Sequence, residues 1–172
     1  MNPANPSKKL TVLIADDMAD TRDSLTRLLH LEKDIEVIGG VSDGQQAIEM
    51  ARKVTPDIVL LDVSMPVVDG ISAAAAIRES GCGSAVIMMS IRDDVQYFRQ
   101  AMLAGARDFL TKPFTGQDLI QAIRGVYEQT ERTSTTRSAT PTSTAPATRI
   151  VQWAEHRRGQ RDGMRQLDDA QN

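Results

Sequence analysis

The sequence predicts an α/β fold built as a doubly wound, five-stranded parallel sheet with the strand order 2-1-3-4-5. The first observation is that short apolar runs, typical of buried parallel strands, alternate five times with segments of helical periodicity. The second is that the loops between them are short, and repeated βα units with short loops favour parallel strands joined by right-handed crossovers. In such a sheet, ligands bind beyond the carboxyl ends of the strands, where the strand order reverses.

Each expected strand is a run of four to six mainly apolar residues bounded by turn-forming or charged residues. In chain order the strands cover residues 10–15, 35–39, 58–62, 85–90 and 107–111. The order 2-1-3-4-5 puts the switch point between the first and third strands, so their carboxyl ends are the expected site.

Each expected helix places apolar side chains three or four residues apart, on one face. In chain order the helices cover residues 20–31, 44–54, 71–79, 93–104 and 115–128. Leu25, Leu28 and Leu29 form the apolar face of the first helix, and the third helix is rich in alanine. Thr115 and Asp118 resemble a capping box at the start of the last one.

Reactive polar residues stand at the ends of four of these strands. They are Asp16 and Asp17, Asp62, Ser90, and the pair Lys112-Pro113. Because the carboxyl ends of parallel strands share one edge of the sheet, three carboxylates, a hydroxyl and an ammonium should converge there. Such a set can hold Mg²⁺, accept a phosphoryl group and neutralise its charge. Taken alone, each residue has a plainer explanation, such as a cap of a turn or helix, or a surface lysine.

These residues, together with the run Asp62-Val-Ser-Met65-Pro66-Val-Val-Asp69-Gly70, resemble the receiver domain of response regulators, the phosphoacceptor domain of two-component systems. The resemblance covers roughly residues 8 to 130 and is specific, because five spaced elements match in order. It implies a flavodoxin-like receiver fold over residues 9–130, between an N-terminal tail at 1–8 and a C-terminal segment at 131–172.

The resemblance also implies a role for each site residue. Asp62 is the expected phosphoacceptor. Asp17 and Asp62 are the expected direct ligands of Mg²⁺, with Asp16 acting through water and the Ser64 backbone carbonyl completing the protein's share. Ser90 and Lys112 are expected to bind the phosphoryl oxygens.

Four further residues complete the expected site. Phe109 occupies the position of a switch aromatic, although a plain core role is an equal alternative because phenylalanine has no hydroxyl. Pro66 and Gly70 are expected to shape the loop after Asp62. Pro113 is expected to follow a cis bond that directs Lys112 toward the site.

The implied function is a phosphorylation switch in two-component signal transduction. A histidine kinase or phosphotransfer protein would donate the phosphoryl group, and residues 93–128 would bind a downstream protein, with a homodimer as a further expectation on phosphorylation. We expect no metabolic enzyme activity and, because residues 1–130 carry 13 basic and 18 acidic side chains, no direct nucleic-acid binding. One cysteine, no secretory signal and no membrane-length apolar run favour a cytoplasmic protein.

Alternatives from other classes remain open. A flavodoxin-type flavin binder needs a phosphate-binding first loop, where this chain has Asp16-Asp17. A phosphatase with an Asp nucleophile would place a second carboxylate at residue 64, which is serine. A DNA-binding regulator needs an output domain, and the segment after residue 130 has no helix-turn-helix pattern. Residues 99–114 are also similar to receivers fused to MinD/CpaE-type ATPases, so the chain could be a receiver remnant of such a regulator.

The C-terminal segment differs in composition from the rest. Ten of the sixteen residues from Thr133 to Thr148 are serine or threonine, which predicts a disordered linker and tail. His30 and His156 have no partner at metal-ligand spacing, so neither is an expected ligand.

Overall fold

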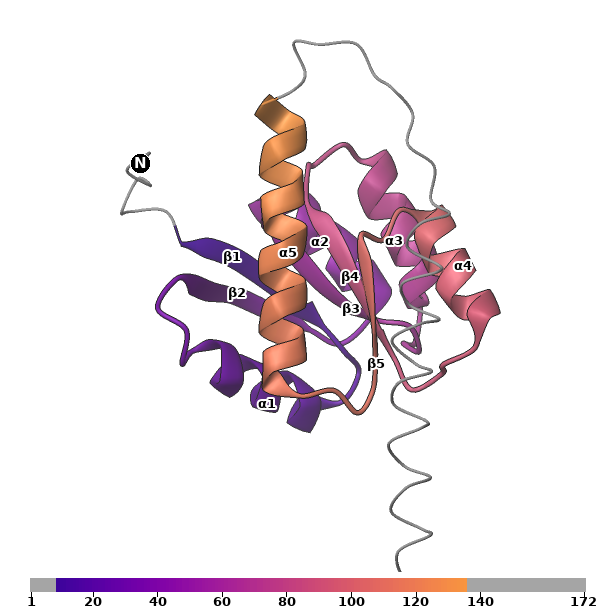
Figure 1. Ribbon diagram of the computed structural model, residues 1–172. Helices are drawn as coiled ribbons and strands as arrows, with labels where there is room; N and C mark the ends of the chain where they lie inside the picture. The colour runs from indigo at the N-terminus through magenta and orange to yellow at the C-terminus, as the bar shows by residue number, and fades with distance from the viewer. Residues whose placement is uncertain (1–8, 136–172) are drawn as a thin grey trace, which may run out of the picture. The chain divides into compact units, whose positions relative to one another are not determined.

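The computed structural model describes residues 9–135, which form a parallel sheet flanked by helices (Figure 1). The strands are β1 (Leu10–Ala15), β2 (Ile35–Val41), β3 (Ile58–Asp62), β4 (Ala85–Ser90) and β5 (Asp108–Thr111). The helices are α1 (Ala19–Leu29), α2 (Gly44–Val54), α3 (Gly70–Glu79), α4 (Val95–Ala104) and α5 (Gly116–Thr135). The sheet order is β2-β1-β3-β4-β5, so the predicted topology is confirmed.

Helices cover both faces of the sheet, because the strands are apolar on both sides. One core lies between the sheet and helices α1 and α5, where Ile14, Leu60 and Ile87 pack against Leu25 and Ile123. On the other face α2 packs against α3, and α3 against α4. Alternate residues of each strand point to opposite faces, so the continuous apolar runs serve both layers. Each fully buried aliphatic side chain stabilises the fold by roughly 1.5–3 kcal/mol.

Register brings the strand ends level at one edge of the sheet. Ala15 of β1 lies beside Leu61 of β3, and Asp62 lies beside Met89 of β4. Ser90 in turn pairs with Thr111 of β5. The residues that end or follow these strands therefore gather within a short distance along the edge.

Most element bounds lie within two residues of the sequence predictions, and two elements extend beyond their predicted ends. Strand β2 continues through Gly39 and Gly40 to Val41, which pairs with Ala15. Helix α5 runs to Thr135, beyond the predicted end at Glu128 and into the first residues of the predicted linker.

Two contacts support the longer α5. The Thr130 hydroxyl donates to the Val126 carbonyl at 2.9 Å, and Arg132 lies 3.7 Å from the Glu128 carboxylate one turn away. The remainder of the predicted linker and tail, and the predicted N-terminal tail at 1–8, lie outside the described residues.

Side-chain caps start α3 and α4, which follow the loops after Asp62 and Ser90. Asp69 accepts from the Ser72 amide at the start of α3, and Asp94 accepts from the Gln96 amide at the start of α4. The predicted capping box is present, since Thr115 and Asp118 bond reciprocally before α5. Within residues 9–135, the helices lack the combination of length and apolar character that crossing a membrane requires.

Candidate functional site

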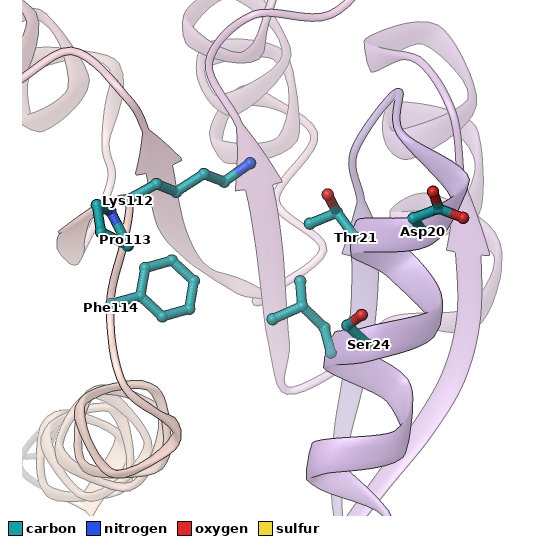
Figure 2. A pocket seen from close by; sticks show the side chains of 7 residues that line it. Asp20, Thr21, Ser24, Lys112, Pro113 and Phe114 are labelled. Atoms are coloured by element: carbon teal, nitrogen blue, oxygen red, sulfur yellow. The ribbon is translucent and has the colours of Figure 1, made fainter.

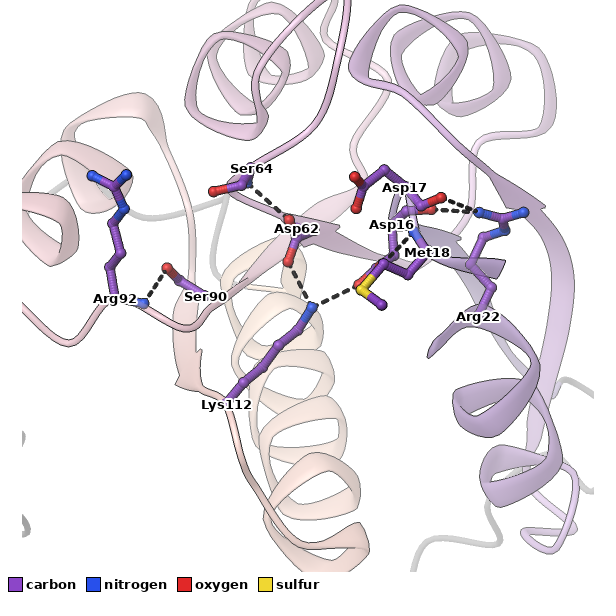
Figure 3. A network of polar contacts seen from close by, with 9 residues as sticks. All are labelled: Asp16, Asp17, Met18, Arg22, Asp62, Ser64, Ser90, Arg92 and Lys112. Carbon is purple, nitrogen blue, oxygen red and sulfur yellow. Dashed lines mark hydrogen bonds and ion pairs between the residues drawn. The ribbon is translucent and has the colours of Figure 1, made fainter. Parts of the chain in front are cut away.

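Three charged side chains meet at the carboxyl edge of the sheet (Figure 3). The Lys112 ammonium donates to an oxygen of Asp16 and to an oxygen of Asp62, each at 2.7 Å. Asp16 is 1% exposed and Asp62 is 6% exposed, so both carboxylates are largely removed from water. Lys112 is 96 positions from Asp16 and 50 positions from Asp62 in the sequence, so the fold brings distant residues into one ion cluster.

The second oxygen of each buried carboxylate has a backbone donor. The Met18 amide donates to Asp16 at 2.9 Å, and the Ser64 amide donates to Asp62 at 2.8 Å. Each carboxylate therefore accepts from the backbone amide two residues after it, in the loop that follows its strand. Among the described residues, every buried side-chain nitrogen and oxygen has a hydrogen-bond partner. The site is therefore held in one arrangement by its own contacts.

Burial and charge shift the titration of this cluster. Burial raises the pKa of Asp62, the Lys112 ammonium opposes that rise, and the Asp16 carboxylate adds to it. For Lys112, burial acts to lower the pKa, but the two carboxylates outweigh it and raise the pKa. A raised pKa of Asp62 favours its neutral form and weakens the ion pair, whereas a raised pKa of Lys112 favours the charged ammonium and strengthens it. We take all three groups as charged, because the 2.7 Å contacts place one ammonium between two carboxylates.

The expected convergence of three carboxylates is met only in part. Asp17 is exposed, and its carboxylate projects from the β1–α1 loop on the side where Asp62 lies (Figure 3). Within residues 9–135 no three acidic, histidine or cysteine side chains are grouped closely enough to hold a metal as they stand. Asp16 and Asp62 instead share the Lys112 ammonium.

The donor set nevertheless fits Mg²⁺ in its chemistry. Asp16, Asp17, Asp62 and the Ser64 carbonyl are hard oxygen donors, which Mg²⁺ prefers. Three carboxylates against one ammonium leave two negative charges uncompensated at the edge, and a divalent cation would relieve their repulsion.

Ser90 and Phe109 lie on the β4–β5 side of the site. Ser90 is 2% exposed, and its hydroxyl accepts from the Arg92 amide at 2.9 Å instead of capping α4. The Phe109 ring is buried and meets the Phe98 ring of α4 edge to face, with centroids 5.8 Å apart. Phe109 thus links strand β5 to α4.

The loop after Asp62 is shaped by Pro66, Gly70 and an unexpected strained residue. A Cβ on Gly70 would lie 2.0 Å from the Asp62 carbonyl oxygen, so glycine is required there for space and not for an unusual turn conformation. The positive φ in this loop belongs to Val67, at 66°, which is rare for a β-branched residue. The Lys112-Pro113 bond is cis, as the resemblance implies.

A pocket of about 360 Å³ opens beside Lys112, between the start of α1 and the β5–α5 loop. Figure 2 shows Asp20, Thr21 and Ser24 on the α1 side, facing the Phe114 ring. Its lining mixes polar and apolar side chains, and of the charged cluster only Lys112 borders it.

Two contacts near the site carry no clear signal in the sequence. Arg22 of α1 donates to the carbonyl oxygens of Asp16 and Asp17. The Arg92 guanidinium lies over the Tyr97 ring and contacts its hydroxyl. Both arginines stand among polar residues in the sequence, so only the folded loops show which groups they contact.

Comparison with known proteins places these features in one family. Residues 12–124 match the family model described as response regulator receiver domain. The transcriptional regulatory protein DegU of Brevibacillus brevis is 32% identical over 74% of this chain and 54% of its own length. The transcriptional regulatory protein PdtaR of Mycobacterium tuberculosis is 43% identical over 65% of this chain and 54% of its own length. The chain thus spans about half the length of these curated relatives.

Among solved structures, the CheX–CheY–BeF₃–Mg complex of Borrelia burgdorferi matches with a TM-score of 0.66 and 30% identity, over 70% of this chain and 90% of that one. These matches do not favour the ATPase-regulator or phosphatase alternatives. Because DegU and PdtaR are transcriptional regulatory proteins, the matches also do not support the expectation that nucleic-acid binding is absent.

Proposed function

Because the chain belongs to the response-regulator receiver family of two-component systems, we propose that Asp62 is its phosphoacceptor. The observation that carries this proposal is the cluster of Asp62, Asp16 and Lys112 at the carboxyl edge of the sheet. A phosphoacceptor needs a carboxylate at a strand end and a nearby cation to neutralise the incoming phosphoryl oxygens. Asp62 ends β3 and already bonds such a cation.

The proposed donor is a phosphorylated histidine of a kinase or phosphotransfer protein. An Asp62 oxygen attacks the phosphorus atom, the P–O bond forms as the P–N bond breaks, and the imidazole nitrogen takes a proton from solvent. The Lys112 ammonium then contacts a phosphoryl oxygen while Asp16 continues to hold it.

Mg²⁺ is the proposed cofactor, and when bound it supplies positive charge to the transferring phosphoryl group. Asp17 and Asp62 are the proposed direct ligands, Asp16 acts through water, and the Ser64 carbonyl contributes the remaining protein oxygen. The solved CheX–CheY–BeF₃–Mg complex supports this choice of metal by family likeness.

The proposed output is a change on the surface formed by residues 93–128. To donate to the phosphoryl group, the Ser90 hydroxyl would turn toward it, and this rotation would break the bond that the hydroxyl accepts from the Arg92 amide in the loop before α4. Phe109 packs on Phe98 of α4, so movement in β5 reaches the same helix. A downstream protein, or a second copy of the chain, would bind the form that this change favours.

The test is phosphorylation by a small phosphodonor with Mg²⁺, followed by intact-mass spectrometry. The wild type should gain one acid-labile phosphoryl group and Asp62→Asn should gain none. Asp69→Asn is the matched control, because asparagine caps a helix as well as aspartate does and the fold is kept. Equal labelling of the wild type and Asp62→Asn would overturn the assignment of Asp62.

A further inference from the structure

Arg22 lies behind the acidic loop, on the side opposite the site. It is in the second turn of α1, three residues before the buried Leu25. Its guanidinium turns back and donates to the Asp16 carbonyl at 2.7 Å and, from the same nitrogen, to the Asp17 carbonyl at 3.3 Å. Figure 3 shows these two bonds on one side of the loop and the Asp17 carboxylate on the other.

Strand β2 packs beside the Arg22 side chain at Gly40. Gly40 lies against the arginine stem, and a Cβ built there would be 3.6 Å from the Arg22 Cδ and 3.9 Å from its Nε. Both distances are ordinary van der Waals contacts, so the strand packs beside the arginine stem without a clash.

From this geometry we infer that Arg22 is a positioning residue for the Mg²⁺ site. It fixes the peptide groups that carry the Asp16 and Asp17 carbonyls, so that both carboxylates remain on the Asp62 side of the loop. Its charge is directed at carbonyl oxygens, so it does not occupy the carboxylate oxygens that a metal would use. This inference rests on the proposed function of the site.

The chemistry of arginine suits this task better than that of lysine. A guanidinium is planar, stays charged, and presents several donors in a fixed geometry that two neighbouring carbonyls can share. A lysine ammonium at residue 22 is a compact point charge on a flexible stem. It would keep the charge behind the loop but hold the two carbonyls less firmly.

The test is calorimetric titration of the full chain with Mg²⁺ alone, without a phosphodonor. Groups that orient metal ligands typically change metal affinity by roughly 10–100-fold when removed. Arg22→Ala should raise the Mg²⁺ dissociation constant by about tenfold, near the lower end of that range, because Arg22 holds backbone carbonyls. Arg22→Lys should raise it by a smaller factor, about threefold.

Arg27→Ala is the matched control, since Arg27 is an exposed arginine in the last turn of the same helix. It removes the same charge and should leave the dissociation constant unchanged. Melting midpoints without Mg²⁺ separate a general loss of stability from a loss of affinity. If Arg22→Ala does not fold, Arg22→Lys decides the question.

The outcomes separate this inference from the proposed function. If the wild type binds no Mg²⁺, the proposed metal site itself is wrong. If the wild type binds but Arg22→Ala and Arg22→Lys bind as tightly, only the positioning role is overturned. If Arg27→Ala weakens binding as much as Arg22→Ala does, net charge explains the effect and the carbonyl contacts do not.

Discussion

Val67 offers a direct test of strain in the loop beside Asp62. Its φ of 66° places a β-branched residue in the left-handed region, and its side chain is 82% exposed. A non-glycine residue held in such a region costs on the order of 1–3 kcal/mol. Asparagine tolerates this conformation better than valine. Because the valine side chain contributes little buried area, Val67→Asn should relieve strain without losing packing.

The expected gain is about 1 kcal/mol in the free energy of unfolding, the lower end of the strain estimate. For a domain of this size that corresponds to a rise of roughly 4 °C in the melting midpoint. Urea unfolding monitored by circular dichroism gives the free energy, and a thermal scan gives the midpoint. An unchanged slope of the urea dependence would show that stability changed and the unfolded state did not.

Two matched variants sharpen the measurement. Thr55→Asn changes another exposed β-branched residue with positive φ, 44°, at the end of α2, and should stabilise the protein similarly. Val95→Asn changes an exposed valine in the first turn of α4 and should bring no gain. If Val67→Asn leaves stability unchanged or lower while Thr55→Asn raises it, the strain argument for the loop is refuted.

Two further predictions concern glycine packing and an exposed ion pair. Gly70→Ala should destabilise the fold by at least about 2 kcal/mol, because its Cβ would meet the Asp62 carbonyl oxygen at 2.0 Å. Gly125→Ala should stabilise the fold by roughly 0.5–1 kcal/mol, because a Cβ there meets open space on α5. Urea unfolding of both variants measures the two changes. The Arg124 hydrogen bond lowers the pKa of Asp34, so their interaction should be present above about pH 4 and lost as pH falls through the lowered value. Arg124→Ala should cost less than about 1 kcal/mol at pH 7 because the pair is exposed, and an equal cost at pH 2 would contradict the linkage.

Much of the fold follows from local sequence. Hydrophobic periodicity placed β1, β3 and β4 at their observed bounds, because each is an apolar run closed by a polar residue. Parallel topology then predicted that Asp16, Asp62 and Lys112 would meet, and the hydrogen bonds between them agree. The prediction succeeded because local sequence shows where each strand ends, and in a parallel sheet the carboxyl ends of neighbouring strands lie at the same edge.

Other features were decided only by the tertiary structure. The Lys112 ammonium lies between the carboxylates of Asp16 and Asp62, whereas Asp17 is exposed. No local pattern distinguishes Asp17 from Asp16 in this respect. The requirement for glycine at residue 70 arises from the Asp62 carbonyl, a neighbour brought close by the fold. Arg22 could be assigned a role only after the loop showed which carbonyls it reaches. The sequence by itself therefore determined which chemical groups stand at the sheet edge, whereas packing between distant segments decided how they are oriented, because side-chain direction depends on contacts that local periodicity does not encode.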